Sequence, residues 1–365
     1  MPNVELVVDG KTGKVRQAGA TQEGKLIQEF KDAAEKHLYV FAKGVLDLSL
    51  LTSHLHAPIC EGLTLCPPYR KLRLLPRDHL KTSMIRALIM HILVQPKEAN
   101  PYFPGKEGAS TRILFAAETA LNAENQLSWI ATKYEGSQLL KALWPQTVWS
   151  GSPQRMSKKW NAGALQLPRK EDYPEASIET IGVGGAVTGR HYDVLVKDDL
   201  ISYAAANSPT IMHDAVQWHK TSRALLHDAK HSLEFMIGTR WAVGDLWQTI
   251  MDIDPSVDVI VRSALENGKP IFPELFSLET LLQIERELGP ALFSLLYMNS
   301  AVNAELTDFD AASFRFFHAY GDELEVEALP EPDPEHPLRV DEYPVSLDVL
   351  RVLEGAASAR SYRSH

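Results

Sequence analysis

The feature that most constrains this chain is a short strand-like stretch that leads directly into an apolar helix-like stretch. Residues 71–75 alternate basic and apolar side chains as a β-strand does, and Pro76 ends the pattern because proline cannot donate to a β-ladder. The pair Lys81 and Thr82 then opens the apolar run 84–94, which predicts a helix. A strand, a tight turn and a Lys-Thr pair at a helix N-terminus follow one another in this way in phosphate-binding loops.

In such a loop, backbone N–H groups and the positive end of the helix hold phosphates. The lysine reaches the β- and γ-phosphate oxygens and the hydroxyl beside it holds Mg²⁺, roles that Lys81 and Thr82 can fill. Leu75 and Leu80 stand where the motif GxxxxGK[ST] has its glycines, so we expect another backbone path or strain. Taken alone, the segment could also be an ordinary strand-to-helix turn capped by Asp78 or Thr82.

Composition limits the classes of protein that this chain can belong to. With 365 residues, 45% of them hydrophobic, it can form two domains or one large α/β domain with appendages. The net charge of −10 gives no general basic field, so any contact with nucleic acid must rest on local patches. No signal peptide is recognisable, and the apolar runs are too short or too often interrupted by charge to span a membrane.

Two cysteines, Cys60 and Cys66, are too few for a disulfide framework and indicate a reducing compartment. Together with His54 and His56 they can be interpreted as a metal site. Their spacing is irregular and the segment looks helical, which favours packed or surface side chains instead.

The order of the remaining elements predicts an α/β fold. Helix-like patterns alternate with short apolar runs, which implies parallel strands joined by right-handed crossovers, with ligands at the carboxyl ends of the strands. A hairpin is possible at Asp9-Gly10. Strands are expected at residues 112–117, 164–167, 177–183, 192–199, 233–241 and 257–261, and helices at 121–133, 137–143, 208–227, 277–288 and 291–297. Apolar residues at helical spacing over 25–51 predict an N-terminal helical subdomain.

Two of these strands end in residues that suit phosphoryl chemistry. Asp198 can hold Mg²⁺ through water, and Asp199 can orient or deprotonate an attacking water. The alternative is that the two aspartates merely begin a turn. Thr239 and Arg240 could contact a γ-phosphate; the alternative is a glycine-mediated strand exit with a solvated arginine.

Four stretches, in this order and spacing, resemble the ATPase part of the large terminase subunit of tailed double-stranded DNA phages. They lie at residues 76–83, 187–199, 237–246 and 268–297. The resemblance implies an ASCE-type P-loop ATPase with a mostly parallel sheet flanked by helices. It also implies a homo-oligomeric ring that docks on the portal protein of a procapsid in the host cytoplasm. With ATP, Mg²⁺ and a small terminase subunit, such a ring drives double-stranded viral DNA inward.

The resemblance also implies roles for single residues. Lys81 would bind phosphate and Thr82 the magnesium, with Asp198 at the Walker B metal position and Asp199 as the catalytic carboxylate. The family commonly has glutamate at the last position, so the shorter aspartate would need a longer reach through water. The whole phosphate loop would comprise Pro76, Arg77, Asp78, His79, Leu80, Lys81, Thr82 and Ser83.

Further roles follow from the same resemblance. Arg77 matches the arginine inside the terminase loop, and Thr239 matches a motif that couples hydrolysis to movement. Arg190, in a Gly-rich loop before the Walker B strand, is expected to act on a neighbouring subunit's nucleotide. Asp78 brings a carboxylate near bound phosphate, which is unfavourable unless it pairs with Arg77 or His79.

We expect an N-terminal helical segment (1–60), a P-loop ATPase domain (61–325) and a short linker and tail (326–365). Residues 329–344 are rich in Pro, Asp and Glu, as linkers are. Large terminases normally continue into a nuclease domain with an acidic cluster that binds metals. The tail here is too short to form a sheet that would bring its carboxylates together, so we predict that this chain has no nuclease activity. These carboxylates are Asp341, Glu342, Asp348 and Glu354.

Two other functions stay open. One is another DNA-dependent P-loop ATPase or helicase, against which the lack of recognisable helicase motifs after Asp199 counts. The other is a catalytically inactive structural or adaptor protein, which the missing loop glycines would favour. ATP turnover separates the inactive protein from both enzymes.

Overall fold

The computed structural model describes residues 6–8, 15–17, 22–186, 189–301, 317–320 and 323–326. The chain divides into two compact units, Met1–Leu306 and Thr307–His365. In the second unit, β13 (Phe317–Tyr320) pairs with β14 (Glu323–Val326) in antiparallel fashion. The expected linker at 329–344 and the four tail carboxylates lie outside the described residues, and the division at residues 60 and 325 stays a prediction.

The first unit contains an eight-stranded, mostly parallel sheet, which confirms the predicted α/β fold. Its strands are β3 (Arg70–Leu74), β4 (Ile113–Ala117), β5 (Trp160–Asn161), β6 (Ala164–Leu165), β7 (Ile178–Gly182), β8 (Val194–Asp198), β9 (Leu233–Gly238) and β10 (Asp258–Val261). The strand order is β10-β3-β9-β8-β4-β7-β6-β5. Strands β10 to β7 pair in parallel, whereas β6 and β5 are antiparallel additions at one edge.

Helices connect the strands, most of them at positions that the sequence predicts; the helix over Leu246–Ile253 is not among the expected ones. The longer ones are α1 (Gln22–Lys36), α3 (His56–Thr64), α4 (Lys81–Val94), α5 (Ala120–Gly136), α6 (Gln138–Leu143), α9 (Pro209–Ser222), α10 (Leu246–Ile253), α11 (Leu278–Leu288) and α12 (Pro290–Leu296). Short pieces are α2 (Leu38–Val40), α7 (Pro153–Met156) and α8 (Tyr203–Ala206). Two small hairpins are β1 (Leu6–Val8) with β2 (Val15–Gln17), on either side of the predicted turn at Asp9-Gly10, and β11 (Leu265–Glu266) with β12 (Lys269–Pro270).

The helical subdomain expected over residues 25–51 consists of several short helical elements. Helix α1 ends at Lys36 because His37 has extended backbone angles, and a π-helical turn over Phe41–Val45 follows α2. A π-turn inserts one extra residue and so rotates the side chains that follow it. Leu38, Phe41 and Val45 all enter the core, at the i, i+3, i+7 spacing of a single helix face.

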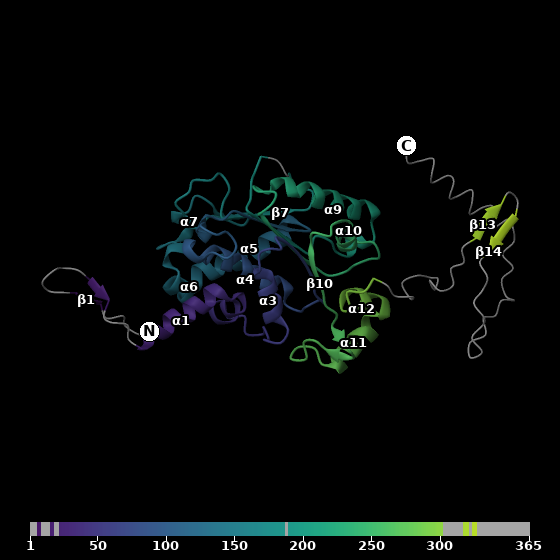
Figure 1. Cartoon of the computed structure of the whole chain (residues 1–365), viewed down its shortest axis with the longest axis horizontal. Helices are drawn as coiled ribbons and strands as arrows, with labels where there is room; N and C mark the ends of the chain where they lie inside the picture. The colour runs from purple at the N-terminus through teal and green to yellow at the C-terminus, as the bar shows by residue number, and fades with distance from the viewer. Residues whose placement is uncertain are drawn as a thin grey trace. The chain divides into compact units, whose positions relative to one another are not determined.

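The two faces of the sheet form two separate cores because side chains alternate along each strand. On one face, Phe235 and Ile237 of β9 join the core that contains α3, α4 and α5. On the other face, Leu72 of β3 and Met236 of β9 pack against α9 and α10. The unit is therefore a sheet between two layers of helices, which can be followed in Figure 1.

The basic residues of β3 are buried rather than solvated. Lys71 donates to the carbonyl oxygen of Leu63 in α3 at 2.8 Å, and burial lowers the pKa of Lys71 to about 8. Arg73 donates to the carbonyl oxygen of Asp258 in β10 at 2.7 Å. Alternating basic residues in this strand thus fasten a helix end and the edge strand to it.

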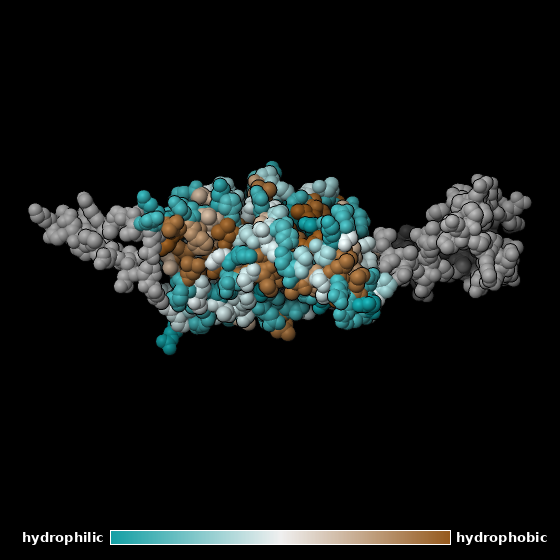
Figure 2. Space-filling view, turned by 90° about the horizontal axis from the view of Figure 1, so that it is seen from below, coloured by the Kyte–Doolittle hydropathy of each residue, from teal (hydrophilic) through white to brown (hydrophobic). Residues whose placement is uncertain are grey.

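The surface of the first unit is mixed. Figure 2 shows hydrophobic residues between hydrophilic ones on the face that it draws. Single exposed apolar side chains of this kind are normal in folded proteins. In the described ranges, every helix is too short or too polar to traverse a lipid bilayer.

A buried histidine gives the fold a testable dependence on pH. His91 of α4 lies within 2.7 Å of the Tyr102 hydroxyl and within 3.0 Å of the Ala34 carbonyl oxygen, and burial lowers the pKa of His91 to about 4. The unfolded chain therefore binds an extra proton between the ordinary value of 6.5 and pH 4. Keeping His91 neutral in the folded state contributes to the free energy of unfolding, and this contribution is complete above pH 6.5. Between pH 6.5 and pH 4 it falls by about 1.4 kcal/mol per pH unit.

We expect His91→Asn to reduce the slope of unfolding free energy against pH by about one proton between pH 6 and pH 5. Urea unfolding at several pH values measures this slope. The exposed His231, replaced in the same way, serves as the control. Parallel curves for the wild type and His91→Asn would show that His91 titrates alike in both states.

Candidate nucleotide site

The loop between β3 and α4 takes a path usually reserved for glycine. Asp78 and Leu80 have φ angles of 62° and 57°, in the left-handed region, although both carry side chains. Each such residue costs about 1–2 kcal/mol, so surrounding contacts must hold the loop in this shape.

His79 and Arg77 provide those contacts. The His79 ring is buried and stacks on Phe276, with 5.0 Å between ring centroids and 3° between planes. Its Nδ1 lies 2.9 Å from the Arg77 carbonyl oxygen and donates to it, since a carbonyl can only accept. The Arg77 N–H donates to the carbonyl oxygen of Leu296 in α12 at 2.9 Å. Burial lowers the pKa of His79 to about 4, so the ring packs as a neutral group.

The start of α4 is open to a ligand. Leu80 is the N-cap residue, and no side chain accepts a hydrogen bond at this cap, so the expected capping by Asp78 or Thr82 is wrong. The N–H groups of the first turn can therefore donate hydrogen bonds to an anion, and the helix dipole adds positive charge at this end. Asp78 is exposed and, among the described residues, forms no ion pair with Arg77 or His79.

Four residues singled out from the sequence meet at this helix end. Strand β9 lies between β3 and β8, and Asp198 and Asp199 stand at the carboxyl end of β8. The Thr82 hydroxyl donates to Asp198 Oδ1 at 3.1 Å, and Lys81 Nζ lies 3.4 Å from Asp199 Oδ2. Lysine, threonine and both aspartates thus share one site, although more than a hundred residues separate the two pairs.

The electrostatics of the two aspartates indicate a site for a cation. Burial and, next, the charge of Asp199 raise the pKa of Asp198 to about 7. The Asp199 Oδ1 atom is buried without a hydrogen-bond partner in the described structure. Mg²⁺ is usually held by one or two carboxylates and a hydroxyl together with substrate phosphates, so Thr82 and Asp198 fit this ion. In the described residues no group of three or more His, Cys, Asp or Glu side chains forms a metal cage.

Lys81, Thr82 and Asp199 line a cavity of about 680 Å³ at the carboxyl ends of the strands. This size lies within the usual range for a small-molecule site. The phosphate loop, the segments after β4, β8 and β9, and Leu275 contribute its walls. The lining residues are Arg77, Asp78, Leu80, Lys81, Thr82, Ser83, Glu118, Asn122, Asp199, Ile201, Ser202, Tyr203, Thr239, Trp241 and Leu275.

Several of these residues carry no motif and were not predicted. Glu118 and Asn122 follow β4, and Ser202 and Tyr203 follow the paired aspartates. The signal that could have found them is position alone, since each comes soon after the carboxyl end of a parallel strand.

Thr239 and Arg240 separate into two roles. Thr239 lines the cavity, and its carbonyl oxygen accepts from Trp247 Nε1 at 3.0 Å. Arg240 is buried, and its Nε donates to Asp245 Oδ2 at 3.0 Å. A solvated arginine at this strand exit is therefore wrong: Arg240 fastens the exit to the start of α10, where Asp245 is the N-cap.

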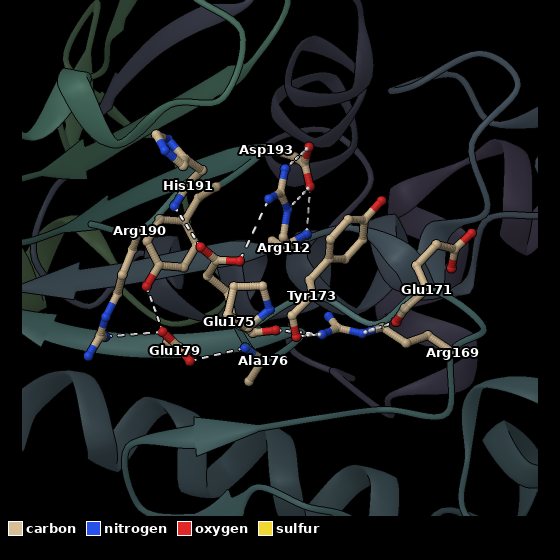
Figure 3. A network of polar contacts seen from close by, with 12 residues as sticks. Arg112, Arg169, Glu171, Tyr173, Glu175, Ala176, Glu179, Arg190, His191 and Asp193 are labelled. Atoms are coloured by element: carbon tan, nitrogen blue, oxygen red, sulfur yellow. Dashed lines mark hydrogen bonds and ion pairs between the residues drawn. The ribbon is translucent and has the colours of Figure 1, made fainter. Parts of the chain in front are cut away.

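Arg190 lies away from this cavity, in the polar network of Figure 3. Its NH1 group is 3.1 Å from Glu179 Oε2, and the Tyr192 hydroxyl donates to the same oxygen at 2.6 Å. Glu179 is the second residue of β7, so Arg190 stands toward the amino ends of the strands. The side chain is 57% exposed. Its action on a neighbouring subunit's nucleotide stays a prediction.

One of the solved structures that match this chain is a bacteriophage protein. No family model matches the chain, and no curated protein matches its sequence. Among solved structures, the large terminase of bacteriophage HK97 matches with 15% sequence identity and a TM-score of 0.41. The chain is similar in fold to that terminase. The match covers 64% of this chain and 47% of the terminase chain, so the chain spans about half the length of that protein.

Proposed function

We propose that this chain is the ATPase part of a terminase large subunit, which hydrolyses ATP to move double-stranded viral DNA into a procapsid. The observation that carries the ATPase proposal is the uncapped start of α4 at the cavity, where Lys81 pairs with Asp199 and Thr82 with the buried Asp198. The coupling to DNA rests on the four stretches of sequence that resemble the terminase family.

Each residue of the site has a distinct task in this proposal. The open N–H groups of α4 and the Lys81 ammonium bind the β- and γ-phosphates and stabilise the charge that develops on them. Thr82 and Asp198 would hold Mg²⁺, which neutralises phosphate charge when bound. Asp199 orients the attacking water or takes its proton, and Arg77 and Thr239 border the transferring group.

The ion pair between Lys81 and Asp199 allows a bound phosphate to replace the carboxylate as the partner of Lys81. Lys81 Nζ is 3.4 Å from Asp199 Oδ2. A phosphate bound at the start of α4 competes with that carboxylate for the same ammonium group. Binding of ATP therefore frees Asp199 for its task on water at the moment when a phosphate has arrived.

The partners follow from the resemblance and extend the proposal. The chain would act in the host cytoplasm as a homo-oligomeric ring on the portal protein, with a small terminase subunit and double-stranded DNA. In the ring, Arg190 would reach the nucleotide of a neighbouring subunit, as arginine fingers do in other nucleotide hydrolases.

The test of the function has two stages. Purified chain should release phosphate from ATP only when Mg²⁺ is present, and portal-bearing procapsids with linear DNA should raise this rate and protect the DNA from nuclease digestion. ATP turnover with strand separation but no DNA protection would indicate a helicase. A chain that neither binds nor hydrolyses ATP would be the inactive adaptor.

The metal role of Thr82 gives a separate prediction. We expect Thr82→Val to raise the Mg²⁺ concentration needed for half-maximal turnover at least about tenfold, because it removes the hydroxyl beside Asp198. Thr82→Ser keeps the hydroxyl and should stay within a few-fold of the wild type. Magnesium titrations of ATP turnover measure both, and equal behaviour of the two variants would remove Thr82 from the metal site.

A further inference from the structure

The carboxylate of Glu118 also borders the nucleotide cavity, and the proposed ATPase mechanism gives it no task. It is the first residue after β4, which pairs with β8 in parallel so that Ala117 lies opposite Asp198. The next residues along the two strands are Glu118 and Asp199. Their side chains line the same cavity as Lys81.

The surroundings of Glu118 differ from those of Asp199. The Ser202 hydroxyl donates to Glu118 Oε1, and in the described part of the chain no lysine or arginine forms an ion pair with Glu118. The Glu118 side chain is half-buried. Asp199, by contrast, already has Lys81 at 3.4 Å. Like Asp78, Glu118 is therefore a carboxylate of this cavity without an ion-pair partner among the described residues.

The backbone at Glu118 is fixed from two sides. The Val183 N–H donates to the carbonyl oxygens of Ala117 at 3.1 Å and Glu118 at 3.3 Å. Gly182 lies so close that an added Cβ would stand 2.5 Å from the Ala120 nitrogen. Such a close approach requires glycine, and it holds the start of α5 against β7. A rigid backbone and a hydroxyl on one oxygen leave Glu118 in a defined position for catalysis.

We propose that Glu118 is a second catalytic carboxylate, which holds the attacking water together with Asp199. The proposal rests on the proposed ATPase function and assigns a further residue to it. Glutamate has one more methylene than aspartate and carries no competing ion pair here, so it supplies the reach that Asp199 lacks. Ser202 orients it by holding Oε1, which leaves Oε2 for water.

The reaction balances with this assignment. The water oxygen forms a bond to the γ-phosphorus while the bond from that phosphorus to the β–γ bridging oxygen breaks. ADP keeps the electron pair of the broken bond. Glu118 takes the proton of the water and passes it to the released phosphate or to solvent, so the carboxylate is restored for the next cycle.

Two substitutions separate a catalytic from a structural role. Glu118→Gln keeps an oxygen that can accept from Ser202 but removes the charge, whereas Glu118→Ala removes both. A catalytic role predicts that both variants lose about 100-fold in kcat. A purely structural role predicts that Glu118→Gln behaves like the wild type and that Glu118→Ala resembles Ser202→Ala. Glu124→Gln, in the helix α5 that follows Glu118 and outside the cavity, is the control.

Binding measurements complete the test. We expect Glu118→Gln to bind a non-hydrolysable ATP analogue within about threefold of the wild type but to bind ADP with aluminium fluoride, which mimics the transition state, at least tenfold more weakly. Wild-type kcat in Glu118→Gln would overturn the role of Glu118 and leave the ATPase proposal intact. Lack of turnover in the wild type would overturn both, so the two failures are distinguishable.

Discussion

Lys81→Ala is expected to lower Mg²⁺-dependent ATP hydrolysis about 10³-fold while leaving the protein folded. The substitution removes the positive charge that stabilises the transferring phosphate, which is where such sites gain most of their catalytic effect. The Lys81 side chain forms an ion pair with Asp199, whose side chain is 42% exposed, so little stability depends on that pair. Circular dichroism melting should therefore give nearly unchanged curves.

The matched control for this substitution is Lys170→Ala. Lys170 is exposed and borders a different cavity, of about 500 Å³, where residues before β4, β8 and β9 meet at the other end of the sheet. Phosphate release by this variant should equal that of the wild type. If Lys81→Ala also keeps turnover within a few-fold, the phosphate-loop assignment is wrong.

Asp199→Asn is expected to lower kcat by about 10²–10³-fold without weakening nucleotide binding. The amide has the shape of the carboxylate but can neither take a proton nor compete as an anion for Lys81. Because the bound phosphate then no longer displaces a charged partner from Lys81, affinity for a non-hydrolysable analogue should stay equal or increase. Fluorescence anisotropy and phosphate release measure the two quantities separately. Equal losses in affinity and rate would move Asp199 to a structural or metal-binding role.

The sequence was sufficient to predict that the main residues of the candidate site lie at one edge of the sheet, but not to predict every residue of the site. Lys81 and Asp199 could be brought together in advance because the carboxyl ends of parallel strands meet at one edge of a sheet. The ends of most predicted strands and helices lie within a few residues of the observed ends, because each element has a clear apolar pattern bounded by Pro, Gly or charged residues.

Other features depend on contacts that no local pattern contains. Glu118 became a candidate only once β4 was known to lie beside β8. The sequence suggests that Arg240 is exposed, because the ion pair that buries it with Asp245 cannot be inferred from a local pattern. The break after α1 depends on how Phe41 packs against Trp144 and His91, which are distant in sequence.

The hydrogen bond between the phosphate loop and α12 limits how short a functional fragment of this protein can be. The residues that line the nucleotide cavity end at Leu275, and a fragment designed around them would stop there. Yet the left-handed residues of the loop are held by Phe276 through His79 and by Leu296 through the Arg77 N–H, and both partners lie far along the chain from the loop. The smallest fragment that keeps a working site must therefore extend past Leu296, and its C-terminal boundary is set by residues that never touch the nucleotide.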